Sequence, residues 1–191
     1  MNALSKPRIY LALVHYPVVN KNGETIASAV TNLDLHDIAR AAKTYDVDVF
    51  YVVTPLADQK ELAGKIVSHW TQGPGSEYNG SRKAALDLIR MEDSLESVKS
   101  HIAGRGEGYP KLVATSAGGW GDCIEFGRLR GILNAGEPYV LAFGTAWGLA
   151  DSVLLSADFV LEPIAGKSGY NHLSVRCAAA IMLDRLLGTA R

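Results

Sequence analysis

Residues 159–187 read FVLEPIAGKSGYNHLSVRCAAAIMLDRLL: a short apolar run, a polar segment that contains glycine, and an alanine-rich run. The Gly-Lys-Ser triplet at 166–168 resembles the end of a phosphate-binding loop, whose pattern is G-x-x-x-x-G-K-[ST]. Here Leu161 stands where that pattern needs its first glycine, and the polar run continues past Ser168 instead of opening a helix. The triplet therefore predicts a loop and not a nucleotide-phosphate site.

The apolar run in this segment is one of several in the chain that predict buried strands. They are rich in β-branched and aromatic residues and cover Ile9–Val14, Val49–Val53, Leu112–Ala114, Tyr139–Phe143 and Phe159–Leu161. Between them lie helical patterns with steps of three and four residues, formed by Leu35, Ile38, Ala42 and Tyr45 and by Leu62, Ile66 and Trp70. Alternating strands and helices predict an α/β fold, with a mostly parallel sheet covered by helices on both faces. We expect one domain over residues 1–191.

The composition excludes several kinds of protein. The chain has 48% hydrophobic residues, and 19 basic residues against 20 acidic ones leave a net charge of -1, so no global positive field attracts nucleic acid. Cys123 and Cys177 form no C-x-x-C pair, which argues against a zinc cage or a disulfide framework. The apolar run near the N-terminus is too short for a signal peptide or a membrane span. We therefore expect a cytoplasmic protein that does not contact membranes.

A loop rich in Gly, Pro, Ser and Asn is predicted over Gly73–Ser81, with a helix from Arg82. Aromatic and basic residues surround it, a mixture that suits single-stranded nucleic acid: Trp70, Tyr78, Arg82 and Lys83. An ordinary surface loop with one anchoring aromatic residue explains the same pattern, and both interpretations stay open.

Three glycine-containing turns follow predicted strands in the last part of the chain, at residues 115–120, 144–149 and 162–166. Ligands of open α/β sheets bind beyond the carboxyl ends of the strands, so three such turns predict one pocket. Glycine and small residues let the main chain approach a flat ligand such as adenine. For any one of these turns taken alone, an ordinary turn is the better interpretation, and it is the three together that favour a pocket. His15 and Tyr16, which follow the first strand, reach the same edge or are structural.

The order of these segments resembles the SPOUT (SpoU/TrmD-type) RNA methyltransferases. FVLEPIAGKSGYNHLSVRCAAAIMLDRLL is similar to their final knot motif, LAFGTAWGLADSV at 141–153 resembles the preceding F-G-x-E-x-x-G-L motif, and AVTNLDLHDIARAAKTYDVDVFYVVTP at 29–55 resembles the first motif. The chain most resembles a small bacterial family of S-adenosylmethionine-dependent RNA methyltransferases, some members of which are fused to the tRNA guanine-N1 methyltransferase.

The resemblance implies a homodimer with a deep C-terminal trefoil knot, S-adenosylmethionine as the cofactor and an RNA substrate, tRNA or rRNA. No metal is implied, and on a helix Asp34, His36 and Asp37 point in divergent directions. The cofactor would contact Thr115, Ser116, Ala117, Phe143, Gly144, Thr145, Trp147, Gly148, Leu161, Glu162, Pro163, Ile164, Asn171, His172, Leu173 and Val175.

The resemblance also implies catalytic roles for Arg40, Asn171, His172 and Ser174. Arg40 would stabilise a developing alkoxide or hold an RNA phosphate, or it is a solvated helix residue. Ser174 is equally suited to cap a helix. The chain lacks the family glutamate after Gly144 and has Ser174 in place of an asparagine.

Arg40 and HLSVRCAAAI narrowly favour ribose 2′-O-methylation. Base methylation of the guanine-N1 type and a non-catalytic RNA-binding module are the alternatives.

Overall fold

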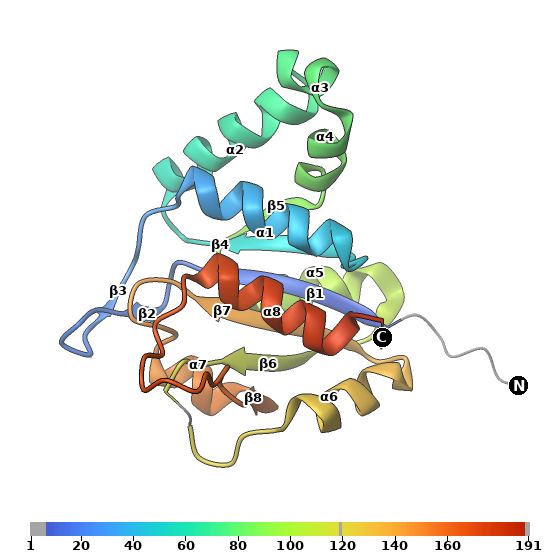
Figure 1. Cartoon of the computed structure of the whole chain (residues 1–191). Helices are drawn as coiled ribbons and strands as arrows, with labels where there is room; N and C mark the ends of the chain where they lie inside the picture. Colours follow the sequence, from blue (N-terminus) through green and yellow to red (C-terminus); the bar gives the residue numbers. More distant parts are fainter. Residues whose placement is uncertain (1–6, 119, 190–191) are drawn as a thin grey trace, which may run out of the picture.

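The structure, a computed structural model, describes residues 7–118 and 120–189. Its centre is a six-stranded sheet with the order β5-β4-β1-β7-β6-β8, in which every neighbouring pair is parallel (Figure 1). The strands are β1 (Arg8–Val14), β4 (Val49–Val53), β5 (Ile89–Glu92), β6 (Lys111–Thr115), β7 (Pro138–Gly144) and β8 (Phe159–Leu161). A separate antiparallel pair is formed by β2 (Val18–Val19) and β3 (Thr25–Ile26). The predicted mostly parallel sheet is confirmed.

The sheet is buried on both faces, and the alternation of side chains along each strand divides the core in two. In β1, Ile9, Leu11 and Leu13 face one cluster, whereas Tyr10 and Ala12 face the other. The first cluster is completed by α1 (Asn32–Thr44), α2 (Ala57–Thr71), α4 (Gly80–Leu86), α6 (Phe126–Ile132) and α8 (Val175–Leu187). The second is completed by α5 (Leu95–Ile102) and α7 (Asp151–Ser156), behind the sheet in Figure 1. Helices on both faces are thus confirmed.

The five predicted strands all form, and their ends agree with the prediction to within one residue. The prediction missed β5, whose sequence Ile-Arg-Met-Glu buries only Ile89. This strand lies at the edge of the sheet, where one side and part of one face meet solvent, so it carries no continuous apolar run.

The predicted loop over Gly73–Ser81 is wrong, because most of it is helical. Pro74 opens the short helix α3 (Pro74–Tyr78), and proline suits the first helical position because no partner is needed for its nitrogen there. Asn79 then starts α4 by accepting a hydrogen bond of 2.9 Å from the main-chain N–H of Arg82. In the preceding helix α2, Leu62 is 45% exposed, so the predicted apolar face is narrower than its spacing suggested.

The topology places the three glycine-containing turns together. Because β7, β6 and β8 are parallel neighbours, their carboxyl ends lie at one edge of the sheet. α8, which follows the closing segment (residues 162–174), packs beside α1 across the front of the sheet (Figure 1). The trefoil knot remains a prediction.

Candidate functional site

The turn after β7 brings its two ends into close contact. Gly144 begins the turn, and Gly148 lies close to it in space. A Cβ added at Gly144 would stand 2.6 Å from the Gly148 carbonyl carbon, and closer still to the Leu149 nitrogen. Main-chain hydrogen bonds close the turn, with Gly148 N–H donating to Thr145 at 2.9 Å and Trp147 N–H to Val19 at 3.0 Å. Gly148 has a φ of +117°, which residues with a side chain rarely adopt. The chain therefore requires glycine here to form this turn.

A chain of polar groups, one buried and two half-buried, supports the same turn from β1. The Thr145 hydroxyl donates to the Val14 carbonyl at 2.9 Å and lies 2.5 Å from the Ser28 hydroxyl. Ser28 in turn lies 3.0 Å from Nδ1 of His15, which is fully buried. His15 thus has a structural position behind the edge, joined to the turn through two hydroxyls. The sequence placed His15 near this edge, but no local pattern pointed to Ser28, which lies beyond a hairpin.

Burial lowers the pKa of His15 to about 4, although the Asp34 carboxylate and the Ala29 carbonyl act to raise it. The unfolded chain, with an ordinary histidine pKa of 6.5, therefore takes up this proton first as the pH falls. The stability linked to His15 is complete above pH 6.5 and is lost between pH 6.5 and about 4.

We expect the free energy of unfolding to fall by about 2 kcal/mol more between pH 7.5 and pH 5 in the parent than in His15→Gln. Urea unfolding at both pH values measures this difference. Equal losses in the two proteins would show that His15 does not titrate in this way.

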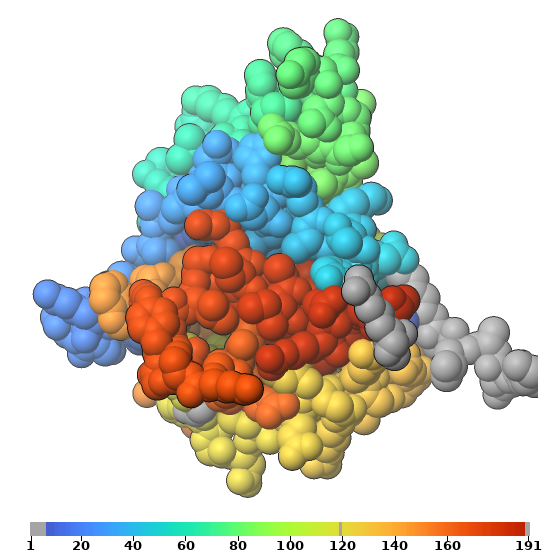
Figure 2. All heavy atoms as spheres, viewed as in Figure 1, coloured from blue at the N-terminus to red at the C-terminus, as the bar shows by residue number. Residues whose placement is uncertain are grey.

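The closing segment is tied to the other turns by few contacts. Asn171 donates from Nδ2 to the Ala117 carbonyl at 2.6 Å, which joins it to the turn after β6. Ser174 is the N-cap of α8, and its hydroxyl accepts from the Cys177 N–H at 3.3 Å. Residues 165–174 are all exposed, and in Figure 2 the segment, drawn orange, arches around a hollow on this face. The segment is thus accessible to a ligand, as recognition of adenine by its backbone groups requires.

An ion-pair cluster fixes the start of α8 against α1. Arg176 Nη1 lies 2.8 Å from a carboxylate oxygen of Asp34, and its Nε lies 3.4 Å from Asp37. The Asp34 side chain is only 8% exposed, so removal of Arg176 would leave a buried carboxylate without this ion-pair partner. His36 points instead to Trp70, with ring centroids 5.4 Å apart. Among the described residues no group of three or more possible metal ligands was found.

Several of the expected cofactor residues have structural contacts of their own. Glu162 accepts a 2.7 Å hydrogen bond from the Phe126 N–H and so holds the start of α6. The Thr115 hydroxyl donates to the Ala142 carbonyl at 2.9 Å. Phe143 and Leu161 are buried, which leaves main-chain groups as what they can offer a ligand. The residues that the sequence grouped as one site therefore fall into two sets. Some have side chains that stabilise the fold, and others have side chains that are exposed to a ligand.

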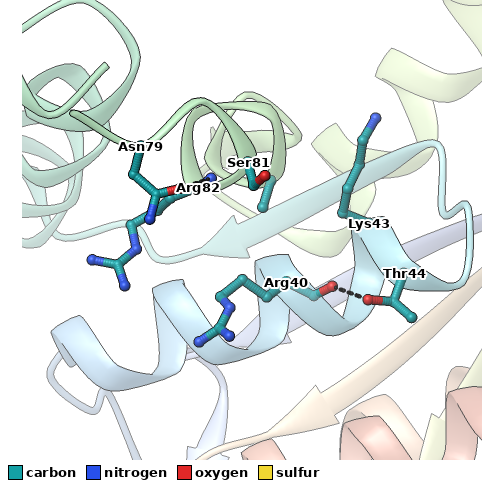
Figure 3. A pocket seen from close by; sticks show the side chains of 7 residues that line it. Arg40, Lys43, Thr44, Asn79, Ser81 and Arg82 are labelled. Atoms are coloured by element: carbon teal, nitrogen blue, oxygen red, sulfur yellow. Dashed lines mark hydrogen bonds between the residues drawn. The ribbon is translucent and has the colours of Figure 1, made fainter. Parts of the chain in front are cut away.

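Arg40 lies apart from these turns. It lines a surface pocket of about 300 Å³ together with Lys43, Thr44, Asn79, Ser81, Arg82 and Ala85 (Figure 3). None of the expected cofactor residues lines this pocket or a second one of about 340 Å³ beside Tyr45 and Arg130. Within one chain, then, the structure brings Asn171, His172 and Ser174 to the carboxyl edge and leaves Arg40 on another surface.

Known proteins resemble this chain over nearly its whole length. The chain is 47% identical over 182 residues to the tRNA (guanine-N(1)-)-methyltransferase of Oleidesulfovibrio alaskensis, a match that covers 95% of this chain and 42% of that protein. It thus spans less than half of that relative. An uncharacterized protein of Aquifex aeolicus is 34% identical, with 96% of this chain and 90% of that protein covered.

The fold is shared with solved methyltransferase structures. The SpoU methyltransferase AviRb of Streptomyces viridochromogenes, solved in complex with AdoMet, superposes with a TM-score of 0.59 at 18% identity, covering 97% of this chain and 58% of that one. At that identity the likeness concerns the fold alone. Within the described residues, no helix is long and apolar enough to cross a membrane. A family model for SAM-dependent RNA methyltransferases matches residues 8–188, and the chain therefore belongs to that family.

Proposed function

We propose that this chain binds S-adenosylmethionine at the carboxyl edge of β6, β7 and β8 and transfers its methyl group to RNA. The observation that carries the proposal is the Gly144–Leu149 turn, packed so tightly that no side chain fits at Gly144, beside the exposed main chain of the closing segment. Main-chain N–H and C=O groups from this turn and from residues 116–118 can read the edge of an adenine while glycine permits close approach.

Methyl transfer from a sulfonium is an in-line displacement. The acceptor forms a bond to the methyl carbon, the bond from carbon to sulfur breaks, the sulfur leaves as a neutral thioether and the acceptor loses its proton. The protein must hold the acceptor in line and receive that proton. Asn171 and Ser174 are engaged by Ala117 and by the helix start, whereas the imidazole of His172 is exposed and close in sequence to both. We assign His172 the role of proton acceptor.

A nitrogen of a tRNA base is the acceptor that these groups fit best. A ribose hydroxyl is a weaker acid than a ring N–H and needs a nearby cation to stabilise its alkoxide. Arg40, one of the two features on which the ribose prediction depended, lines a pocket on another surface of the protein. Arg176 is already paired with Asp34 and Asp37. The name of the O. alaskensis relative supports guanine N1 in tRNA as the position to test first. That name describes a protein of which this chain spans 42%, so the named activity can reside in the other part.

Ribose 2′-O-methylation is the second candidate. The sequence HLSVRCAAAI at 172–181 follows the SpoU branch, and a partner subunit could bring its own Arg40 to the edge in the expected homodimer. Light scattering of the purified chain measures whether that dimer exists.

Two measurements test the proposal. Isothermal titration with S-adenosylmethionine is expected to show one site per chain, and total tRNA incubated with the chain and cofactor is expected to gain 1-methylguanosine, detected by mass spectrometry of nucleosides. 2′-O-methylguanosine has the same mass but carries the methyl group on its sugar fragment, so it would identify the ribose alternative. The proposal requires at least that the folded protein binds S-adenosylmethionine. A folded protein that does not bind it would rule the proposal out. RNA binding without transfer to tRNA or rRNA would favour the non-catalytic module.

A further inference from the structure

A basic groove lies between α1 and α4, away from the proposed cofactor edge. Arg40 and Lys43 come from α1 and Arg82 from α4, and all three line this pocket; in Figure 3 the two arginine side chains extend to one side and the Lys43 side chain to the other. The other lining residues with polar side chains are Thr44, Asn79 and Ser81, and the lining contains no acidic residue. The basic groove is therefore a concave surface with three cations and several uncharged hydrogen-bonding groups.

Among the described residues, the cations of the basic groove form no ion pair with a carboxylate. Some basic side chains elsewhere are paired with carboxylates, as in Arg176 with Asp34, Arg105 with Glu107 and Lys111 with Asp158. Within residues 7–118 and 120–189, no ion pair involves Arg40, Lys43 or Arg82. In a chain with a net charge of -1, unpaired cations gathered in one groove favour an anionic ligand.

The positive charge of the groove also acts on its neighbour His36. Burial lowers the pKa of His36, Arg82 and Arg40 lower it further, and the Asp37 carboxylate opposes them. The charges of Arg82 and Arg40 thus both act on His36, although burial is the largest cause of its lowered pKa.

Arg82 is held in position. Its guanidinium lies 4.5 Å from the centroid of the Trp70 ring, a cation–π contact. Trp70 is itself fixed, because Gly75 packs so closely that a Cβ there would come 2.7 Å from the ring. His69 also meets Trp70 edge to face, with centroids 5.2 Å apart. A guanidinium held by stacking loses less conformational freedom when it binds an anion.

We propose that the basic groove binds the phosphodiester backbone of the RNA substrate. The proposal rests on the proposed function and extends it, because it places the RNA across α1 and α4 as well as at the cofactor edge. It assigns Arg40 a phosphate contact. The chain as a whole has no positive field, so a local set of cations must supply the attraction that RNA needs. Tyr78 precedes the lining residue Asn79 in the chain and is 88% exposed, so its ring offers a face on which a base can stack. A free anion such as pyrophosphate would not use that ring.

Binding of fluorescently labelled total tRNA, without cofactor and over a series of salt concentrations, tests the proposal. Lys43→Ala and Arg82→Ala are each expected to raise the Kd for tRNA about five- to tenfold at low salt. Each should also make the plot of log affinity against log salt less steep by about 0.7 to 1, the value for one lost phosphate contact. Arg82→Ala removes a contact with Trp70 and could disturb the local packing. Lys43 is exposed, so Lys43→Ala tests the groove without that effect.

Lys65→Ala is the matched control, because Lys65 is an exposed lysine on α2 that is already paired with Glu61. It should bind tRNA as the parent does, to within about twofold, since an exposed pair contributes little. Unchanged affinity and salt dependence in both groove variants would overturn the proposal, as would the absence of salt-dependent tRNA binding by the parent. Pyrophosphate binding is measured in the same proteins. Groove variants that lose pyrophosphate binding but bind tRNA as the parent does would also overturn the proposal and indicate a site for a free anion.

The cofactor separates this inference from the proposed function. Isothermal titration should show that the groove variants bind S-adenosylmethionine as the parent does. If the parent protein binds tRNA through the groove but neither binds cofactor nor transfers methyl groups, the proposed function is refuted. The proposal that the groove binds RNA would still hold.

Discussion

Gly144→Ala should weaken S-adenosylmethionine binding at least about 100-fold and lower the free energy of unfolding by about 3 kcal/mol. The added methyl group would meet main-chain atoms of Gly148 and Leu149, and main chain cannot turn aside as a flexible side chain can. The turn must therefore open. Val19, which exchanges hydrogen bonds with Trp147 and Gly148, would lose its alignment. Isothermal titration and urea unfolding measure the two effects.

Gly127→Ala provides the matched control. Gly127 lies in α6, and a Cβ there meets nothing within 4 Å. Alanine in a helix should leave cofactor binding unchanged and increase stability slightly, by less than about 1 kcal/mol. A Gly144→Ala protein that binds cofactor like the parent would show that the turn is not part of the cofactor site.

Arg176→Met should lower the free energy of unfolding by about 2 to 3 kcal/mol. Methionine retains much of the apolar stem but leaves the Asp34 carboxylate buried without its ion-pair partner. The same change frees the first turn of α8 from α1, so cofactor affinity should fall as well because Ser174 and the closing segment precede that turn. Urea unfolding at neutral pH gives the stability change.

A double-mutant cycle separates the two ion pairs of Arg176. With Asp34→Asn the coupling energy should be about 2 kcal/mol, because Asp34 is buried. With Asp37→Asn it should be below about 1 kcal/mol, since the Asp37 side chain is 49% exposed. Equal coupling energies would contradict the assignment of Asp34 as the main partner.

The sequence predicted those elements whose signal is local. Runs such as Val49–Val53 form strands because a parallel strand covered on both faces needs apolar residues at every position. Leu35, Ile38 and Ala42 are buried as their helical spacing indicated. The edge strand β5 escaped prediction because an edge position does not require such a run. The helix from Arg82 was predicted and forms most of α4, whereas α3 and the first residues of α4 escaped because glycine and proline were taken as loop residues.

The candidate site divides in the same way. The turns after β6, β7 and β8 were predicted together, since parallel strands end at one edge whatever their order in the sheet. The functions of individual side chains were harder to predict from the sequence. Ser174 was predicted equally as a catalytic residue and as a helix cap, and the structure shows that it caps α8. Its catalytic role stays a prediction, as do the knot and the homodimer.

By itself, the sequence determined the α/β class, the positions of five strands and the order of turns that identifies the family, because each depends on residues that are close together in the chain. Only the tertiary structure decided which charges meet. Arg176 is paired with Asp34, 142 positions away, while Arg40 and Arg82 line one pocket whose described lining contains no carboxylate. Such contacts depend on how α8 and α4 pack against α1, and the spacing of residues along the chain does not encode that packing.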